Sequence, residues 1–222
     1  MESHIVKIIA IQQVTHDVKS FRVEKPTGYN FVPGQATEIA INQPGWQEER
    51  RPFTFTSLAH EPTLELTIKQ YADHKGVTQK LHQLVAGDEI ILHDVWGAIE
   101  YKGPGYFIAG GAGITPFIAI LRQLHRDNQL AGNTLFFSNK TAADVIYEDE
   151  LTGMMGSNAQ YILSRERKTG YEFGIINIEF LRSHVTDFNK HFYVCGPDKM
   201  ITDINAILEK LGAQPDLVVF EK

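Results

Sequence analysis

The first hundred residues contain several short runs in which hydrophobic and polar residues alternate. Residues 20–24 and 64–69 alternate cleanly, as half-buried β-strands do, because successive side chains point to opposite faces of a sheet. Glycine and proline turns separate the runs from one another. Many short strands at close spacing predict a small antiparallel β-barrel. The strands that we expect lie at residues 5–14, 20–24, 36–41, 51–57, 64–69, 89–92 and 98–101.

One stretch in this half breaks the alternation. Leu81, Leu84 and Val85 fall at helical spacing within residues 76–85. Thr78 is the expected N-cap, because a threonine hydroxyl can accept a hydrogen bond from the first helical turn. The sequence therefore predicts one short helix inside the β-rich half.

After residues 102–105, which read Lys-Gly-Pro-Gly, the pattern changes to strand followed by helix. Such alternation predicts a doubly wound α/β domain with a parallel sheet and ligands at the carboxyl ends of its strands. We expect two domains, residues 1–102 and residues 103–222. The expected strands of the second are residues 106–109, 134–137, 160–163, 191–195 and 217–220, and its expected helices are residues 116–128, 147–155, 178–185 and 198–211.

Composition narrows the class of protein. The 222 residues are 43% hydrophobic and 22% charged, and no apolar run approaches the roughly 18 residues that span a bilayer. The net charge of −6 argues against a general affinity for nucleic acid. A single cysteine excludes an internal disulfide and a four-cysteine iron–sulfur cluster, and no metal-binding spacing of histidines is visible. With no leader at the N-terminus, we expect a cytoplasmic protein.

Four short motifs follow one another along the chain. Residues 51–57 read Arg-Pro-Phe-Thr-Phe-Thr-Ser, residues 76–78 Gly-Val-Thr, residues 110–116 Gly-Gly-Ala-Gly-Ile-Thr-Pro and residues 195–197 Cys-Gly-Pro. Each motif alone has a purely structural alternative, which is, in the same order, an ordinary strand, a helix cap, a strand–helix turn and a buried cysteine. Together and in this order they resemble the ferredoxin–NADP reductase superfamily of flavoproteins. Its flavin motif, Arg-x-(Tyr/Phe)-(Ser/Thr)-x-x-Ser, is matched by Arg51, Phe53, Thr54 and Ser57.

The resemblance implies a Greek-key flavin barrel followed by an NAD(P)-binding domain. A flavin is a flat apolar ring with a polar edge, so Phe53 can stack on it and the Arg51 guanidinium can bind its phosphate. The resemblance places the Thr54 hydroxyl near N5, the atom that accepts hydride. Ser57 either holds the turn or reaches the ligand. Two further residues, Ile68 and Lys69, are expected to line the flavin through their backbone groups.

The second motif suits a pyrophosphate. Gly76, Val77 and Thr78 begin a helix, whose N-terminus offers free N–H groups and a partial positive charge; a plain helix cap is the alternative. Tyr71 either stacks on an adenine, as an aromatic residue does in many FAD-bearing relatives, or lies on the surface. On these grounds we expect FAD rather than FMN.

The third motif follows a strand and opens a helix, which is the context in which a glycine loop binds a dinucleotide. Pro116 stands where Gly-x-Gly-x-x-Gly has its third glycine, and a proline in the first helical turn loses no hydrogen bond. Members of the superfamily bind the nicotinamide nucleotide with this variant. Gly111, Gly113, Thr115 and Pro116 are therefore expected at that nucleotide, with Thr115 facing the nicotinamide.

The fourth motif ends a strand. The resemblance places Cys195, followed by Gly196 and Pro197, beside nicotinamide C4, where we expect it to shape the hydride-transfer site by packing, not by nucleophilic attack. Thr54, Thr115 and Cys195 are then expected to meet in the cleft between the domains. In some relatives a C-terminal acid or aromatic residue covers the flavin. Phe220 and Glu221 are the candidates for this position, and Glu221 is also a catalytic candidate. A frayed chain end is the alternative.

The identity of the nicotinamide nucleotide rests on two strand ends. NAD-specific sites use an acid about 20 residues past the glycine loop, and residues 138–140 read Ser-Asn-Lys instead. Ser164, Arg165 and Tyr171 resemble the 2′-phosphate site of NADPH-using members, although NADH-using relatives also carry Ser-Arg there. We therefore favour NADPH over NADH.

The sequence thus predicts a flavin-dependent oxidoreductase that passes electrons from NAD(P)H to a one-electron carrier, by resemblance a ferredoxin or a flavodoxin. One alternative is a reductase component for an oxygenase or a haem protein, since such modules share both domains. Another is a non-catalytic regulatory module that only binds flavin and nucleotide, although the intact motifs of residues 51–57 and 110–116 argue against it.

Overall fold

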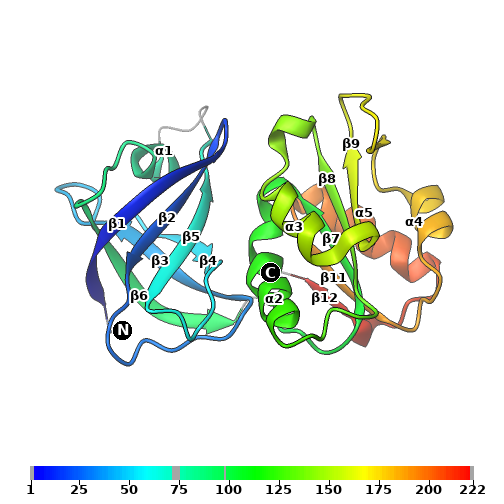
Figure 1. Cartoon of the computed structure of the whole chain (residues 1–222), viewed down its shortest axis with the longest axis horizontal. Coiled ribbons are helices and arrows are strands. Elements are labelled where there is room, and N and C mark those ends of the chain that lie inside the picture. Colours follow the sequence, from blue (N-terminus) through cyan, green and yellow to red (C-terminus); the bar gives the residue numbers. More distant parts are fainter. Residues whose placement is uncertain (1–2, 72–75, 98, 221–222) are drawn as a thin grey trace. The chain divides into compact units, whose positions relative to one another are not determined.

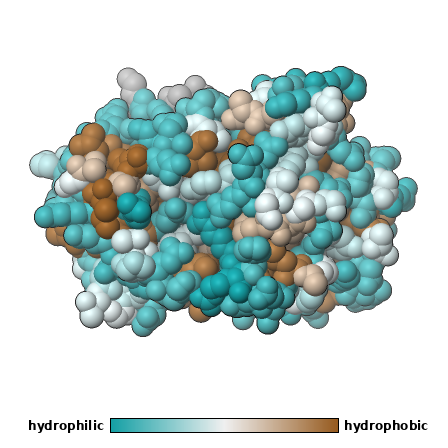
Figure 2. All heavy atoms as spheres, in the orientation of Figure 1, coloured by the Kyte–Doolittle hydropathy of each residue, from teal (hydrophilic) through white to brown (hydrophobic). Residues whose placement is uncertain are grey.

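In a computed structural model of the chain, residues 3–71, 76–97 and 99–220 are described. The chain divides into two compact units, Met1–Ala98 and Ile99–Lys222. That two domains meet after residue 102 stays a prediction. Each unit is described by itself (Figure 1). On the face shown in Figure 2, hydrophilic residues predominate and hydrophobic residues form small groups.

The first unit is a six-stranded antiparallel sheet curled into a barrel (Figure 1). Its strand order is β4-β3-β6-β1-β2-β5, so a hairpin of β1 and β2 lies beside strands that come from elsewhere in the unit. Residues from every part of the predicted β-rich half therefore share one sheet. Its elements are β1 (His4–Thr15), β2 (Val18–Glu24), β3 (Gln35–Ile41), β4 (Arg51–Thr54), β5 (Thr63–Lys69), α1 (Val77–Leu81) and β6 (Glu89–Gly97).

The barrel interior is filled by the hydrophobic members of the alternating runs. Burying one large apolar side chain stabilises a fold by roughly 1.5–3 kcal/mol, so this alternation fixes which face of each strand points inward. Phe55 is fully buried and packs on Phe31, with the two ring centroids 4.3 Å apart. The core includes Val6, Ile8, Phe21, Val23, Ile39, Ile41, Leu64, Leu66, Ile68, Leu81, Ile90 and Leu92.

The second unit is a six-stranded parallel sheet in the order β10-β9-β8-β7-β11-β12, with helices on both faces (Figure 1). The helices α4 and α5 cover one face, where Phe180, Leu181, Ile204 and Leu208 pack in one core with Phe136 and its sheet neighbours. The described elements are β7 (Gly105–Gly110), η1 (Gly111–Ile114), α2 (Thr115–Arg126), β8 (Thr134–Asn139), η2 (Ala142–Asp144), α3 (Glu148–Met155), η3 (Gly156–Asn158), β9 (Ala159–Leu163), β10 (Glu172–Phe173), α4 (Ile178–His184), β11 (His191–Cys195), α5 (Asp198–Lys210), η4 (Pro215–Leu217) and β12 (Val218–Phe220).

This architecture confirms the predicted fold class, an antiparallel flavin-type barrel and a doubly wound parallel sheet. Three local predictions were wrong. Residues 89–97 form one continuous strand, and residues 99–101 belong to none; residue 98 lies outside the described part. The two-residue strand β10 was missed because it is too short to show a period. Among the described residues, no helix is both long and apolar enough to cross a membrane.

The third wrong prediction concerns the N-cap of α1. Gly76, not Thr78, occupies this position, and α1 ends at Leu81. Thr78 lies inside the helix, where its carbonyl accepts from the N–H of His82. A glycine has no side chain with which to cap the first turn, so the N–H groups there receive no side-chain hydrogen bond.

Candidate active site

The first candidate site is the place where the barrel closes. In the described part of the chain, β4 pairs only with β3, and β5 pairs along its length only with β2. The chain directly after β4 meets β5 at an isolated bridge between Phe55 and Leu66, beside which the Thr56 N–H donates to the Glu65 carbonyl at 2.9 Å. Beyond this bridge, no described strand pairs with the outer edges of residues 51–54 and 67–69. We call these two unpaired edges the seam.

The hydrogen-bond ladder decides which residues of β5 offer backbone groups to the seam. The Gln70 N–H donates to the Asp17 carbonyl at 2.7 Å, and the register pairs Lys69 with Val18. Backbone groups in an antiparallel ladder point alternately to the two sides. Those of Ile68 therefore point to β2, and those of Thr67 and Lys69 point to the seam. Thr67 was not singled out from the sequence, because only the register reveals this direction.

The observed strand β4 ends at Thr54, before the predicted end at residue 57, but its side chains and those of the next two residues alternate as predicted. Phe53 and Phe55 belong to the inner face, where Phe53 is half-buried against the core and Phe55 is fully buried. Thr54 and Thr56 take the other face and are both buried. The Thr56 hydroxyl bonds to the Glu65 carboxylate at 2.8 Å. Part of the Phe53 ring is thus exposed at the unpaired edge of the sheet.

Ser57 stabilises the closure of the barrel. Its Oγ accepts a hydrogen bond from the Glu65 N–H at 2.9 Å, and the residue is 1% exposed. This bond is the turn-holding role weighed for the residue. The Ser57 hydroxyl keeps a proton to donate, so its contact with a ligand stays a prediction.

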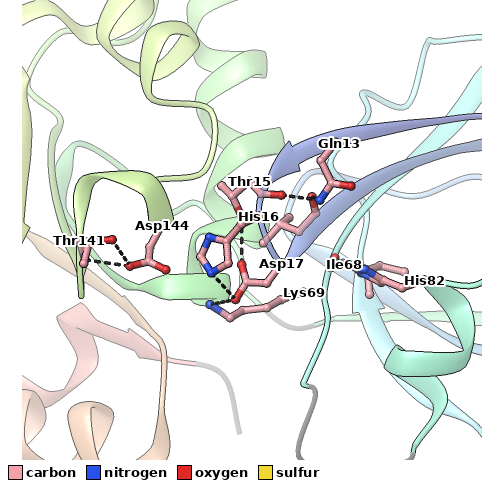
Figure 3. A network of polar contacts seen from close by, with 10 residues as sticks. Gln13, Thr15, His16, Asp17, Ile68, Lys69, His82, Thr141 and Asp144 are labelled. Atoms are coloured by element: carbon pink, nitrogen blue, oxygen red, sulfur yellow. Dashed lines mark hydrogen bonds and ion pairs between the residues drawn. The ribbon is translucent and has the colours of Figure 1, made fainter.

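The cations at the seam are paired differently. Arg51 is exposed, with Nη1 donating to the Arg50 carbonyl and Nη2 lying 3.7 Å from Glu49 Oε2. Such exposed ion pairs contribute little, so a phosphate can compete for this guanidinium. Lys69 Nζ lies 2.9 Å from Asp17 Oδ2 (Figure 3). Its side chain is therefore engaged, and its backbone is the part that faces the seam.

The helix α1 is connected to β5 through its C-terminal end. His82 caps this end, and its Nε2 lies 2.8 Å from the Ile68 carbonyl (Figure 3). Burial lowers the pKa of His82 below its ordinary value. At the other end, Val77 is buried and Thr78 is half-buried, while Tyr71 is 49% exposed. Residues 72–75 lie outside the described part.

The second candidate site lies in the parallel sheet at its switch in strand order. From β7 the chain proceeds through β8 and β9 to one edge of the sheet, then returns to β11 on the other side of β7. Ligands of open α/β sheets bind at such a point, outside the carboxyl ends of the strands. The glycine motif leaves β7 there and the Cys-Gly-Pro motif leaves β11 there, so the sheet brings the two motifs together.

The contact between these motifs requires glycine. A Cβ atom on Gly113 would lie 2.5 Å from the carbonyl carbon of Cys195, which is closer than real Cβ contacts come. Gly111 has φ = +53°, and a Cβ atom built on it would meet nothing within 4 Å. Cys195 itself is 3% exposed. The loop thus packs backbone against backbone on one side and leaves open space beside Gly111.

The loop continues directly into α2. Residues Gly111–Ile114 form a single 3₁₀ turn, and Pro116 sits in the first turn of α2 as expected. Thr115 Oγ1 donates to the Ala112 carbonyl at 3.0 Å. This bond holds the turn, and it leaves the oxygen of Thr115 able to accept a further hydrogen bond.

Two neighbouring strand ends lie at the same edge of the sheet. The Ser164 N–H and Oγ both donate to the Asn139 carbonyl, at 2.9 and 3.3 Å. Arg165 follows and is exposed, with no side-chain hydrogen bond or ion pair to any other described residue. The Asn139 side chain is buried, and its amide has no partner among the described residues. Sequence reasoning noted residues 138–140 only for lacking an acid.

Tyr171 lies in the loop after β9 and is held by an acid. Its hydroxyl donates to Glu148 Oε1 at the start of α3. Burial, together with this hydrogen bond and the charge of Glu148, raises the pKa of Tyr171 to about 12. The hydroxyl is therefore committed to Glu148, and the ring is the part of Tyr171 that remains for a nucleotide. Glu221, also singled out from the sequence, lies outside the described residues.

Comparisons with protein families assign both units. Residues 3–125 match the FAD-binding domain family, and residues 107–206 match the oxidoreductase NAD-binding domain family. The first match covers more than half of the chain. These matches agree with a barrel whose edges are open at the flavin motif and with a sheet that joins its two motifs at the switch point.

Several characterised proteins are similar over nearly the whole chain. The reductase component of propane 2-monooxygenase from Rhodococcus jostii is 28% identical over 97% of this chain and 62% of its own length. The glycine betaine monooxygenase reductase subunit from Pseudomonas aeruginosa is 26% identical over 94% of this chain and 61% of its own length. The chain thus spans somewhat less than two thirds of these two relatives.

Solved structures show the same fold. The FAD/NAD-binding domain of nitric oxide dioxygenase from Vibrio cholerae superposes with a TM-score of 0.89 at 21% identity, covering 100% of this chain and 98% of that one. A ferredoxin NADP⁺ reductase from Neisseria gonorrhoeae gives a TM-score of 0.87 at 19% identity, with coverage of 100% and 98%. The chain belongs to the FAD-binding domain family, carries an oxidoreductase NAD-binding domain after it and has the ferredoxin reductase-like fold.

Proposed function

We propose that this protein is an NAD(P)H-dependent flavoprotein reductase that supplies electrons to an oxygenase or a haem protein. The seam carries the proposal, because two free strand edges offer backbone donors and acceptors to the polar edge of a flat ring. When bound, FAD takes two electrons together from the nicotinamide and releases them one at a time. The protein's part is to bind, orient and enclose the two cofactors.

The flavin is held by both edges of the seam. The Phe53 ring stacks on it, the Thr54 hydroxyl lies near N5 and the Arg51 guanidinium binds phosphate. On the facing edge, Thr67 and Lys69 supply main-chain groups. This replaces the expected backbone contact of Ile68, whose N–H and carbonyl are directed to β2.

The choice of FAD over FMN depends on the N-terminal end of α1 and on Tyr71. Gly76, Val77 and Thr78 present uncapped N–H groups that suit a pyrophosphate. Tyr71 exposes half of its surface, which leaves its ring available to an adenine. The match to an FAD-binding family supports the same choice.

The nicotinamide nucleotide binds at the switch point of the parallel sheet. Gly111 and Gly113 let it approach the backbone, and α2 begins at Thr115 with its N-terminus toward the phosphates. Cys195, Gly196 and Pro197 form the opposite wall, on which the nicotinamide rests. That this site meets the flavin in a cleft stays a prediction.

We favour NADPH as the nucleotide. Arg165 is exposed and makes no ion pair within the described part of the chain, so its guanidinium is free to bind a 2′-phosphate. The Ser164 hydroxyl lies beside it at the end of β9. Tyr171 contributes its ring, since its hydroxyl is held by Glu148.

The comparisons favour the alternative acceptor over the one we preferred from the sequence. Similar proteins over 94–97% of the chain are reductase components of monooxygenases, and the FAD/NAD-binding domain of a nitric oxide dioxygenase shares the fold. A ferredoxin or flavodoxin carrier is therefore the second candidate. The match of residues 107–206 to the oxidoreductase NAD-binding domain family argues against a purely regulatory module.

A spectroscopic titration tests the function. Protein reconstituted with FAD is mixed anaerobically with NADPH, and its flavin absorbance is expected to bleach. Oxidised acceptors are then added: cytochrome c, flavodoxin, ferredoxin and an iron oxygenase. Recovery of absorbance with the oxygenase or the haem protein, faster than with the two carriers, supports the proposal. A flavin-loaded protein that NAD(P)H does not bleach contradicts it.

A further inference from the structure

His82 is a buried residue that the flavin and nucleotide sites leave unexplained. It is 9% exposed and lies at the C-terminal end of α1. Its ring packs at a tilt against Phe21, with the two centroids 6.0 Å apart. Burying an imidazole without a hydrogen-bond partner costs free energy. The hydrogen-bond partner of the His82 ring therefore indicates its role in the fold.

The partner of His82 is the main chain of β5. Nε2 lies 2.8 Å from the carbonyl oxygen of Ile68 (Figure 3). A carbonyl can only accept, so Nε2 must carry the proton in this contact. Burial lowers the pKa of His82, which keeps the ring neutral and leaves a single N–H for this bond.

The position of Ile68 in the strand gives this bond its significance. Ile68 stands between Thr67 and Lys69, whose backbone groups point to the seam. Its own N–H and carbonyl point to β2, so His82 adds a second donor on the side away from the flavin. Lys19 reinforces the arrangement, because its Nζ donates to the His82 carbonyl at 2.8 Å. The peptide plane that joins the Ile68 carbonyl to the Lys69 N–H is thereby held in one orientation.

We propose that His82 is a positioning residue that fixes the flavin-binding edge of β5 through its hydrogen bond to the Ile68 carbonyl. This inference rests on the flavin site proposed above. His82 does not touch the flavin. Its effect is on the direction in which Lys69 presents its N–H group to the seam, and on how tightly the polar edge of the ring is held.

The test compares His82→Leu with His82→Gln. Leucine removes the donor, and glutamine reaches about as far as Nε2 and keeps one. Losing one hydrogen bond of this kind is expected to weaken FAD binding roughly tenfold. It is also expected to shift the visible absorption and circular dichroism of the bound flavin. His82→Gln is expected to restore affinity to within about twofold of the unaltered protein.

A matched control is available in the same barrel. His93 is also buried, burial also lowers its pKa, and its Nε2 has no partner among the described residues. His93→Leu is expected to leave the FAD affinity and spectrum unchanged. If His82→Leu and His93→Leu weaken FAD equally, or if neither does, the inference is overturned.

Two further outcomes are distinguishable. If His82→Leu does not fold, His82→Asn takes its place, because asparagine keeps an amide that is too short to reach Ile68. Equal FAD affinity and spectra for the asparagine and glutamine variants then overturn the inference. If the unaltered protein fails to bind FAD, the proposed function itself fails. If the unaltered protein binds FAD and the His82 variants bind it with the same affinity and spectrum, the proposed role of His82 fails and the proposed function does not.

Discussion

At the scale of single residues, three neighbouring cations differ in what engages them. Arg165 is exposed and makes no ion pair in the described part of the chain, whereas the Arg167 guanidinium lies 3.8 Å from the centroid of Phe173. Lys168 Nζ lies 5.1 Å from the centroid of Tyr171. These three cationic side chains therefore differ in how readily they can bind a phosphate.

Arg165→Ala tests the nucleotide preference. Loss of a hydrogen bond to a charged group costs about 1.5–3 kcal/mol, so the KM for NADPH is expected to rise roughly 10–100-fold. The KM for NADH is expected to change little, because NADH lacks the 2′-phosphate. Steady-state rates with ferricyanide as acceptor measure both constants. Arg167→Ala is the matched control and should leave both near their starting values. Equal increases for the two nucleotides would remove the assignment of Arg165.

At the scale of elements, the contact between η1 and the end of β11 is made by backbone. The strands β7 and β11 pair in register, with Ala109 opposite Cys195, so the two loops leave the sheet side by side. A side chain at Gly113 would enter this contact, whereas Gly153 in the exposed part of α3 has no atom within 4 Å of its Cβ position. These two glycines therefore form a natural pair for comparison.

Gly113→Ala is expected to destabilise the second unit and to weaken nucleotide binding. Forcing atoms into a packed contact costs about 1–3 kcal/mol, which urea unfolding followed by far-UV circular dichroism can measure. Gly153→Ala should be neutral or stabilise by up to about 1 kcal/mol, because alanine favours a helix over glycine. Lower stability together with weaker nucleotide binding in Gly113→Ala would agree with this account. Unchanged stability and binding would show that the loop tolerates a Cβ there.

At the scale of the whole molecule, two buried histidines couple stability to pH. Burial lowers the pKa of His82 and of His93 below the ordinary value of 6.5. Unfolding exposes both rings and restores that value, so the unfolded chain binds protons first as the pH falls. The stabilisation from keeping them neutral is complete above about pH 6.5. It is lost as the pH drops toward their folded pKa values.

The measurement can be confined to the barrel. Both tryptophans, Trp46 and Trp96, lie in the first unit, so urea unfolding followed by tryptophan fluorescence reports on it. The urea midpoint is expected to fall between pH 7.5 and pH 5. Replacing both His82 and His93 by glutamine, which does not titrate, should flatten this fall. An equally steep decline in the double variant would assign the pH dependence to other groups.

Much of the fold could be predicted from the sequence because its signals are local. The strand at residues 191–195 and the helices near residues 116–128 and 198–211 were predicted within two residues of their observed bounds. Each combines a clear hydrophobic period with a glycine or proline at one end. The weak predictions lay where the local signal was short or mixed. The strand expected at residues 98–101 is only four residues long and is interrupted by one acid, and β10 has two residues in all.

The candidate site was only partly predictable. Arg51, Phe53 and Thr54 stand out in a motif, and residues 110–116 and 195–197 do so as well. Thr67, Asn139 and His82 belong to no motif. Their relevance follows from strand register, burial and contacts with residues that are distant in the sequence. For Ser57 the motif left a turn-holding role and a ligand contact open, and the structure adds the hydrogen bond that its hydroxyl accepts from the Glu65 N–H.

The sequence by itself determined the class of the fold, the order of its elements and the residue types available to each cofactor. These follow from hydrophobic period, turn residues and motif spacing, all of which act over a few residues. Only the tertiary structure decided that the chain directly after β4 meets β5 at an isolated bridge and leaves the seam open. Only it decided that His82 reaches Ile68 and that Gly113 lies against Cys195. The physical reason is that strand register and packing join residues 11 to 82 positions apart, and no local pattern encodes which partners they choose.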